Sequence, residues 1–128
     1  MKTPTLEELN PFSSIILDSC ITVHKGMGPG LLESVYHHCL SKELGLRNLK
    51  VDSMVQVPLV YRGEELNKSY VIDLLIEGEI MEIKSMDGIL PIHEAQILSY
   101  LKLANKRLGL LINFNVKLLK EGVRRFVN

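Results

Sequence analysis

The chain has 128 residues, of which 46% are hydrophobic and 23% are charged, with 9 Gly and 5 Pro. This length suits one domain over residues 1–128, and the composition excludes disordered, collagen-like and low-complexity chains. No apolar run approaches the roughly 20 residues of a membrane span, and the polar residues 1–8 lack the pattern of a secretory signal. We therefore expect a soluble cytoplasmic domain without a membrane role, in which the two cysteines are free thiols.

The net charge is zero, but the charges are unevenly distributed. Residues 101–128 carry seven Lys and Arg against Glu121 alone, so this segment is +6 and residues 1–100 are −6. A basic end beside an acidic body is one pattern of nucleic-acid binding next to an acidic metal site. The alternative is that these cations are only the solvent-exposed faces of a strand and a helix.

Two helices are predicted at the start of the chain. In residues 11–24 apolar side chains recur at three- and four-residue steps: Phe12, Ile15, Ile16, Cys20 and Val23. The Gly- and Pro-rich residues 26–30 then end the helix. A second helix is predicted over residues 31–44, with Gly45 as its C-cap and with Leu32, Val35, Cys39 and Leu40 facing inward.

Residues 51–85 change to the two-residue period of strands. Apolar residues alternate in 51–62, a second strand is predicted over 68–77, and Glu77-Gly78 turns the chain into a third strand over 79–85. Pro91 then opens a helix over 92–104. The order indicates a three-stranded meander followed by a crossover helix.

The last part of the chain predicts one more buried strand. Residues 107–113 are almost all apolar, which favours burial on both faces, and a final strand or helix segment closes the chain. A strand, a helix and the next strand of one sheet are expected to make a parallel pair. The fold class is therefore α/β, with a mixed central sheet flanked by helices.

Three charged residues converge at the second hairpin. If Glu77-Gly78 are its two loop residues, Asp73 lies directly opposite Glu82, and the strand period places Lys84 on the same face as Glu82. Two opposed carboxylates repel unless a cation lies between them, and Mg²⁺ prefers oxygen ligands and leaves room for phosphate oxygens. A neighbouring lysine can orient an attacking water. The alternative is a surface hairpin with a cross-strand ion pair.

Asp73, followed after eight residues by Glu82-Ile83-Lys84, resembles the core motif of the PD-(D/E)XK nuclease superfamily. Gly30-Leu-Leu-Glu33-Ser-Val-Tyr36 matches the signature of the GxxExxY protein family, and this resemblance extends over residues 15–127. It implies an αβββαβ restriction-endonuclease-like core with an extra N-terminal helix. The proline that names the superfamily is Ile72 in this sequence.

The resemblance also implies roles for individual residues. Asp73 and Glu82 would bind Mg²⁺ or Mn²⁺ through their carboxylates, Ile83 through its carbonyl, and Glu33 directly or through water. Lys84 would assist the nucleophile. The alternative for Glu33 is a solvent-facing residue whose negative charge is favourable near a helix N-terminus.

Gln96-Ile-Leu-Ser-Tyr100 resembles the QxxxY motif of RecB-like nucleases. Residues four apart share one helical face, so the resemblance implies that Gln96 and Tyr100 together position the substrate. The alternative is helix–sheet packing with a satisfied amide and hydroxyl.

Together these features predict a metal-dependent nuclease that hydrolyses nucleic acid, with DNA as the expected substrate. The alternative is a catalytically silent nuclease-fold module that binds nucleic acid or a partner protein. The presence of Asp73, Glu82 and Lys84 favours the enzyme. Because the net charge is zero and aromatic residues are few, a homodimer or a protein partner is a candidate source of further DNA-binding surface.

Overall fold

The computed structural model describes the backbone of residues 6–128 and the side chains from residue 11 onward. The first five residues, part of the N-terminus that we interpreted as lacking a secretory signal, lie outside the described residues. No helix within residues 6–128 has both the length and the apolar character that crossing a bilayer requires.

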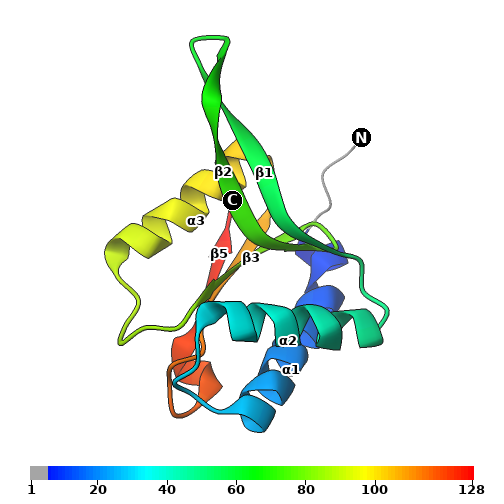
Figure 1. Cartoon of the computed structure of the whole chain (residues 1–128). Coiled ribbons are helices and arrows are strands. Elements are labelled where there is room, and N and C mark those ends of the chain that lie inside the picture. Colours follow the sequence, from blue (N-terminus) through cyan, green and yellow to red (C-terminus); the bar gives the residue numbers. More distant parts are fainter. Residues whose placement is uncertain (1–5) are drawn as a thin grey trace.

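The elements follow the predicted order along the chain (Figure 1). They are α1 (Leu6–Met27), α2 (Glu33–Leu46), β1 (Val51–Tyr61), β2 (Glu64–Ile76), β3 (Glu79–Lys84), α3 (Pro91–Leu103), β4 (Leu108–Asn113), the 3₁₀ helix η1 (Leu119–Gly122) and β5 (Val123–Val127). The final segment, which the sequence left open between strand and helix, contains one short piece of each.

The five strands form one mixed sheet in the order β1-β2-β3-β4-β5. The pairs β1–β2, β2–β3 and β4–β5 are antiparallel, and β3–β4 is parallel. The parallel pair is the one that α3 connects, as predicted for a strand–helix–strand unit.

Helices cover both faces of this sheet. Helices α1 and α2 bury Ile16, Cys20 and Leu40 against one face, and α3 buries Ile97 and Leu101 against the other. Strand β4 is buried along its whole length because its alternate residues face the two helical layers. The architecture is the predicted α/β restriction-endonuclease-like fold, with α1 as the extra N-terminal helix.

Some predicted details of the helices are wrong. Leu32 is 74% exposed because α2 begins only at Glu33, and Ile15 is 38% exposed at the edge of the α1 stripe. Gly45 is not the C-cap, because α2 continues to Leu46 and caps at Arg47. The chain leaves the helix through Asn48, which has a φ of 62° and takes the left-handed conformation expected of a glycine at this place.

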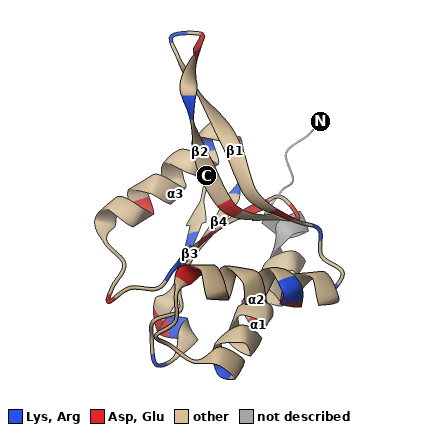
Figure 2. Ribbon diagram, in the orientation of Figure 1, with Lys and Arg blue, Asp and Glu red and all other residues tan. Residues whose placement is uncertain are grey.

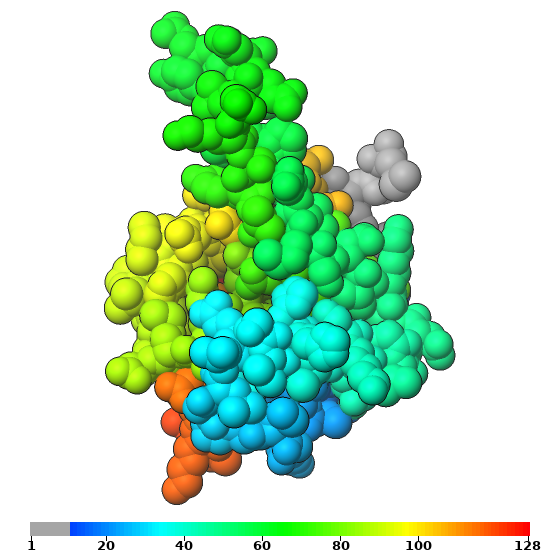
Figure 3. Space-filling model, viewed as in Figure 1, coloured from blue at the N-terminus to red at the C-terminus, as the bar shows by residue number. Residues whose placement is uncertain are grey.

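The first hairpin is longer than predicted. Strand β2 begins at Glu64 rather than near residue 68, and the turn is Arg62-Gly63, with φ values of 52° and 79°. Residues 61–70 are exposed throughout, and this end of the hairpin projects from the body of the molecule (Figures 1 and 3). Residues 62–69 show no alternation of apolar residues, and at the base of this part the Tyr70 ring packs on Tyr100 of α3.

Candidate functional site

The β2–β3 hairpin has the predicted register. Glu77 and Gly78 form its two-residue turn with φ values of 49° and 89°, and the pairs run from Ile76↔Glu79 to Leu74↔Met81. The next residue, Asp73, belongs to neither neighbouring ladder. The pairs between β1 and β2 run from Ser53↔Leu74 directly to Val55↔Ile72 and so omit Asp73. The residue omitted on β1 is Met54, which has a φ of 52°. The strands therefore part at Asp73.

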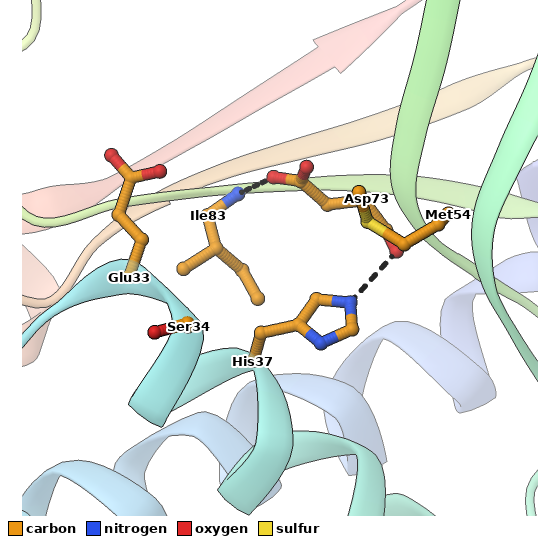
Figure 4. Close-up of a pocket in the computed structure, with 6 residues that line it drawn as sticks. All are labelled: Glu33, Ser34, His37, Met54, Asp73 and Ile83. Carbon is orange, nitrogen blue, oxygen red and sulfur yellow. Dashed lines mark hydrogen bonds between the residues drawn. The ribbon is translucent and has the colours of Figure 1, made fainter.

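Side chains replace the missing ladder bonds at this opening. The Ile83 N–H donates to Oδ2 of Asp73 over 2.7 Å, and the Asp73 N–H donates to Oε2 of Glu82 over 2.8 Å. The Asp73 carbonyl accepts from Nε2 of His37 over 3.1 Å (Figure 4). Main-chain groups that would otherwise lack partners are thus satisfied, and the same bonds hold the two carboxylates side by side.

The two carboxylates lie where negative charge is unfavourable. Burial, followed by the charge of Asp73, raises the pKa of Glu82 to about 8. Burial also raises the pKa of Asp73, although the Ile83 N–H and the Lys84 charge act in the opposite direction. A cation bound between the two carboxylates would favour their charged forms and so oppose the effects of burial and of their mutual repulsion on both pKa values.

The donor set fits a hard divalent cation. Each carboxylate uses one oxygen in a main-chain hydrogen bond, which leaves the Oδ1 of Asp73 and the Oε1 of Glu82. A residue in a strand presents its N–H and carbonyl to the same side, so the Ile83 carbonyl also faces the opening. Carboxylate and carbonyl oxygens with several waters are the ligands that Mg²⁺ takes in proteins.

Glu33 lies near this pair without joining it. As the first residue of α2 it lines a cavity of about 300 Å³ together with Ser34, His37, Met54, Asp73 and Ile83 (Figure 4). Its charge contributes to the raised pKa of Asp73. Within the described part of the chain, however, no three His, Cys, Asp or Glu side chains are grouped to hold a metal ion.

The remaining predicted residues differ in burial and in their electrostatic effect on the carboxylates. Lys84 is half-buried, and its charge lowers the pKa of both Asp73 and Glu82. Tyr100 reaches the site from α3: burial and then the Glu82 charge raise its pKa, and its ring packs 4.7 Å from that of Tyr70. Gln96, one turn earlier on α3, is exposed to solvent.

His37 is the residue that the sequence analysis missed. It lies four residues after Glu33, so the two share one face of α2 and line the same cavity. This four-residue spacing from Glu33 is the feature of the sequence that could have indicated His37 as a site residue. Because the Asp73 carbonyl can only accept, Nε2 of His37 carries the hydrogen, and His37 thereby fixes the main chain of a predicted metal ligand.

The GxxExxY residues fix how α2 begins. Gly30 has a φ of 90°, which favours glycine in the turn before the helix. The Tyr36 hydroxyl donates to the Gly28 carbonyl over 2.6 Å and accepts from the Leu31 N–H over 3.1 Å. The Tyr36 ring stacks on Phe114 with centroids 4.5 Å apart. Tyr36 is thus a core residue whose hydroxyl holds the main chain of residues 28–31, just before Glu33 begins α2.

A mixed sheet between helical layers, with two carboxylates and a lysine at the opening of its central hairpin, defines a nuclease-like domain. The family model of the PD-(D/E)XK nuclease superfamily matches residues 10–126, and the chain belongs to this superfamily. No curated protein and no solved structure matches the chain. The finer resemblance to the GxxExxY family stays a prediction.

Proposed function

We propose that the protein is a nuclease that hydrolyses the phosphodiester bonds of DNA with Mg²⁺ or Mn²⁺ as its cofactor. The observation that carries the proposal is the pair formed by Asp73 and Glu82. The buried carboxylate of Glu82 and the half-buried carboxylate of Asp73 are held together by main-chain hydrogen bonds, and the Lys84 charge acts on both. This arrangement is unfavourable for a merely structural pair and suitable for binding a divalent cation.

In this proposal each residue has a separate task. Asp73, Glu82 and the Ile83 carbonyl hold the ion, and Glu33 contributes through a water because it stands apart from the pair. When bound, the ion polarises the phosphate and makes water more acidic. Lys84 orients the attacking water and stabilises the negative charge that develops on the phosphate oxygens.

Tyr100 and Gln96 are proposed to contact the substrate from α3. The hydroxyl of Tyr100 lies close enough to the carboxylates for their charge to raise its pKa. Gln96 is exposed one turn earlier on the same helix, so a strand bound along α3 passes both residues. Their role is to position the phosphate and not to take part in proton transfer.

A catalytically silent module is the second candidate. One observation favours it: both carboxylates already hold main-chain N–H groups, so part of their role is to complete the sheet. Such a module would bind nucleic acid or a partner protein but would have no need of a cation.

Cleavage of labelled substrates tests the proposal. Single- and double-stranded DNA and RNA are incubated with Mg²⁺, with Mn²⁺ or with EDTA. We expect cleavage of DNA that EDTA abolishes and that Glu82→Gln lacks when it is purified in parallel. Glu79→Gln is the matched control, since Glu79 is a buried Glu on the same strand but outside the site. A folded, monodisperse protein that cuts none of these substrates with either metal would leave the silent module as the better account.

A further inference from the structure

A second cavity, of about 480 Å³, lies between the C-terminal end of α1 and the segment before β5. Three lysines line it: Lys25 from α1, and Lys117 and Lys120 from the later segment. The same two elements add the apolar side chains of Ile21, Leu118 and Leu119 and the imidazole of His24, and Gly28 and Pro29 complete the lining. No acidic residue is among its lining residues.

The position of this cavity is fixed relative to β3. Nε2 of His24 and the Val116 carbonyl are joined by a hydrogen bond of 2.8 Å, which ties the end of α1 to the later segment. The Phe114 N–H donates to the Lys84 carbonyl over 2.9 Å, so the same segment is anchored at the residue that ends β3. The segments that carry the three lysines are therefore tied to each other and to the end of β3.

No ion pair among residues 11–128 neutralises the positive charge of the cavity. Across the described residues the ion pairs are those of Arg47 with Asp18 and with Glu43, so none of the three lysines contacts a carboxylate. Lys117 and Lys120 belong to the basic C-terminal segment, and Lys25 comes from the acidic remainder. In the ribbon of Figure 2, the blue colour of Lys and Arg appears at the end of α1 and on the adjoining loop. Like charges brought together in this way favour an anionic ligand.

The cavity lies close enough to the site for one substrate to reach both. Gly28 lines the lysine cavity and Glu33 lines the cavity beside Asp73. Five residues of extended chain span at most roughly 18 Å. One strand of duplex DNA advances about 3.4 Å for each nucleotide, so the facing edges of the two cavities, at Gly28 and Glu33, are separated by about five base pairs or fewer.

The lining favours one kind of anion. No Phe, Tyr or Trp lines the cavity, so it offers no platform on which unpaired bases stack. No hydroxyl, amide or carboxylate side chain lines it to recognise a ribose 2′-hydroxyl. Lysines acting through charge alone suit the phosphate backbone of a duplex whose bases are turned inward.

We propose that this lysine cavity binds the phosphate backbone of duplex DNA up to about half a turn away from the bond that is cut. The inference rests on the proposed function, to which it adds a second substrate contact. It also gives a role to part of the basic C-terminal segment, because Lys117 and Lys120 of that segment line the cavity together with Lys25 of α1.

Binding of a fluorescently labelled 20-base-pair DNA duplex, measured by anisotropy in EDTA at several salt concentrations, tests this proposal. The test variant is Lys25→Ala/Lys117→Ala/Lys120→Ala, and the matched control is Lys42→Ala/Lys50→Ala/Lys68→Ala, three exposed lysines outside the cavity, outside α3 and outside the basic C-terminal segment. The slope of log K against log salt changes by about 0.9 for each phosphate contact. We expect the test variant to lose about two to three such contacts and about tenfold in affinity. The control keeps the wild-type values.

The possible outcomes separate this inference from the proposed function. A test variant with wild-type affinity and slope, made from a protein that cuts DNA, overturns the lysine site and leaves the nuclease proposal intact. A wild type that neither binds nor cuts DNA overturns both. Loss of binding to an RNA duplex but not to the DNA duplex contradicts the assignment to DNA. If the triple variant does not fold, Lys117→Gln and Lys120→Gln are measured singly, with an expected change of about 0.9 in slope for each.

Discussion

At the scale of single residues, Asp73 has two roles at once. Its carboxylate bonds to the Ile83 N–H, as a neighbouring strand would, and its own N–H bonds to the Glu82 carboxylate. The side chains that are proposed to bind the ion therefore also hold together the opening in the sheet. This explains why the carboxylates stay adjacent despite their repulsion, and why the loss of one of them changes the other.

Lys84→Ala should separate metal binding from turnover. The carboxylates and the Ile83 carbonyl remain, so Mg²⁺ still binds, although the charge that lowers the pKa of Asp73 and Glu82 is lost. Turnover should fall by about 10²-fold or more, as when a group that stabilises the transition state is removed. Single-turnover cleavage together with a Mg²⁺ titration checks this. An Ala variant that cuts at the wild-type rate would contradict the role given to Lys84.

His37→Leu should weaken the metal site without touching any ligand. The Asp73 carbonyl loses its N–H donor, so Asp73 is held less firmly, and loss of such an outer partner typically lowers metal affinity by about 10–100-fold. His37→Gln keeps an N–H donor and should restore most of the affinity. Calorimetric titration with Mg²⁺ measures both variants.

His38→Leu is the matched control for this experiment, because His38 is the exposed neighbour on the same helix. It should bind Mg²⁺ as the wild type does. If His37→Leu lowers the melting temperature but leaves the Mg²⁺ affinity unchanged, His37 has only a structural role.

The sequence was sufficient to predict the carboxylate pair but not its support. A two-residue turn at Glu77-Gly78 and a period of two determine that Asp73 comes opposite Glu82, and both rules are local. The contact of His37 with Asp73 depends on how α2 lies against the sheet. The parting of the strands depends on the backbone of Met54 in β1, where a left-handed residue other than Gly, Asn or Asp has no clear sequence signal.

At the scale of elements, the start of β3 contains a second buried carboxylate. Oε1 of Glu79 accepts a hydrogen bond from the Ser13 hydroxyl of α1, and Oε2 has no hydrogen-bond partner among the described residues. Burial raises the pKa of Glu79 to about 7, against the hydrogen bond from Ser13 and the charge of Arg125. The packing of α1 on the sheet therefore contains a group that ionises near neutral pH.

Glu79→Gln should change how stability depends on pH. The folded pKa of Glu79 is about 7 and the ordinary value is 4.5, so stability that is present below about 4.5 is lost as the pH rises through 7. Gln does not ionise and keeps an oxygen for Ser13. The free energies of unfolding should agree near pH 4 and differ by about 3 kcal/mol at pH 8, with Gln the more stable.

Urea unfolding of both proteins between pH 4 and pH 8 measures this difference. Glu82 also has a raised pKa, but it is present in both proteins, so its contribution cancels in the difference between their free energies of unfolding. Curves that stay parallel over the whole pH range would show that Glu79 ionises as freely as it does in the unfolded chain.

The elements themselves were largely predictable, and the errors share a cause. Helix and strand periods are produced by burial, and they identified the elements that pack in the core. The predicted bounds were wrong where residues are exposed to solvent. These places are Leu32 before α2, the end of α2 beyond Gly45, and the exposed part of the first hairpin. In those places the ends are set by local backbone conformation, as at Asn48, Arg62 and Gly63.

At the scale of the whole molecule, the site lies where all three layers meet. The sheet supplies Asp73, Glu82 and Lys84, one helical layer supplies Glu33 and His37, and the opposite layer supplies Tyr100. No single element can assemble this set, because its members come from both helical layers and from the sheet between them. Function and folding of this domain are therefore expected to be lost together when a layer is displaced.

Thermal melting with and without Mg²⁺ tests the central claim, that Asp73 and Glu82 form a metal site, before any substrate is needed. At about ten times the dissociation constant, Mg²⁺ should stabilise the wild type by about 1.4 kcal/mol, or about 5 °C in a domain of this size. Glu79→Gln should respond equally. Without metal, Glu82→Gln should melt no lower than the wild type, because the cost of burying the Glu82 charge and its repulsion with Asp73 are gone. It should not respond to Mg²⁺, because a ligand is gone. Melting curves that are insensitive to Mg²⁺ in all three proteins would contradict the account.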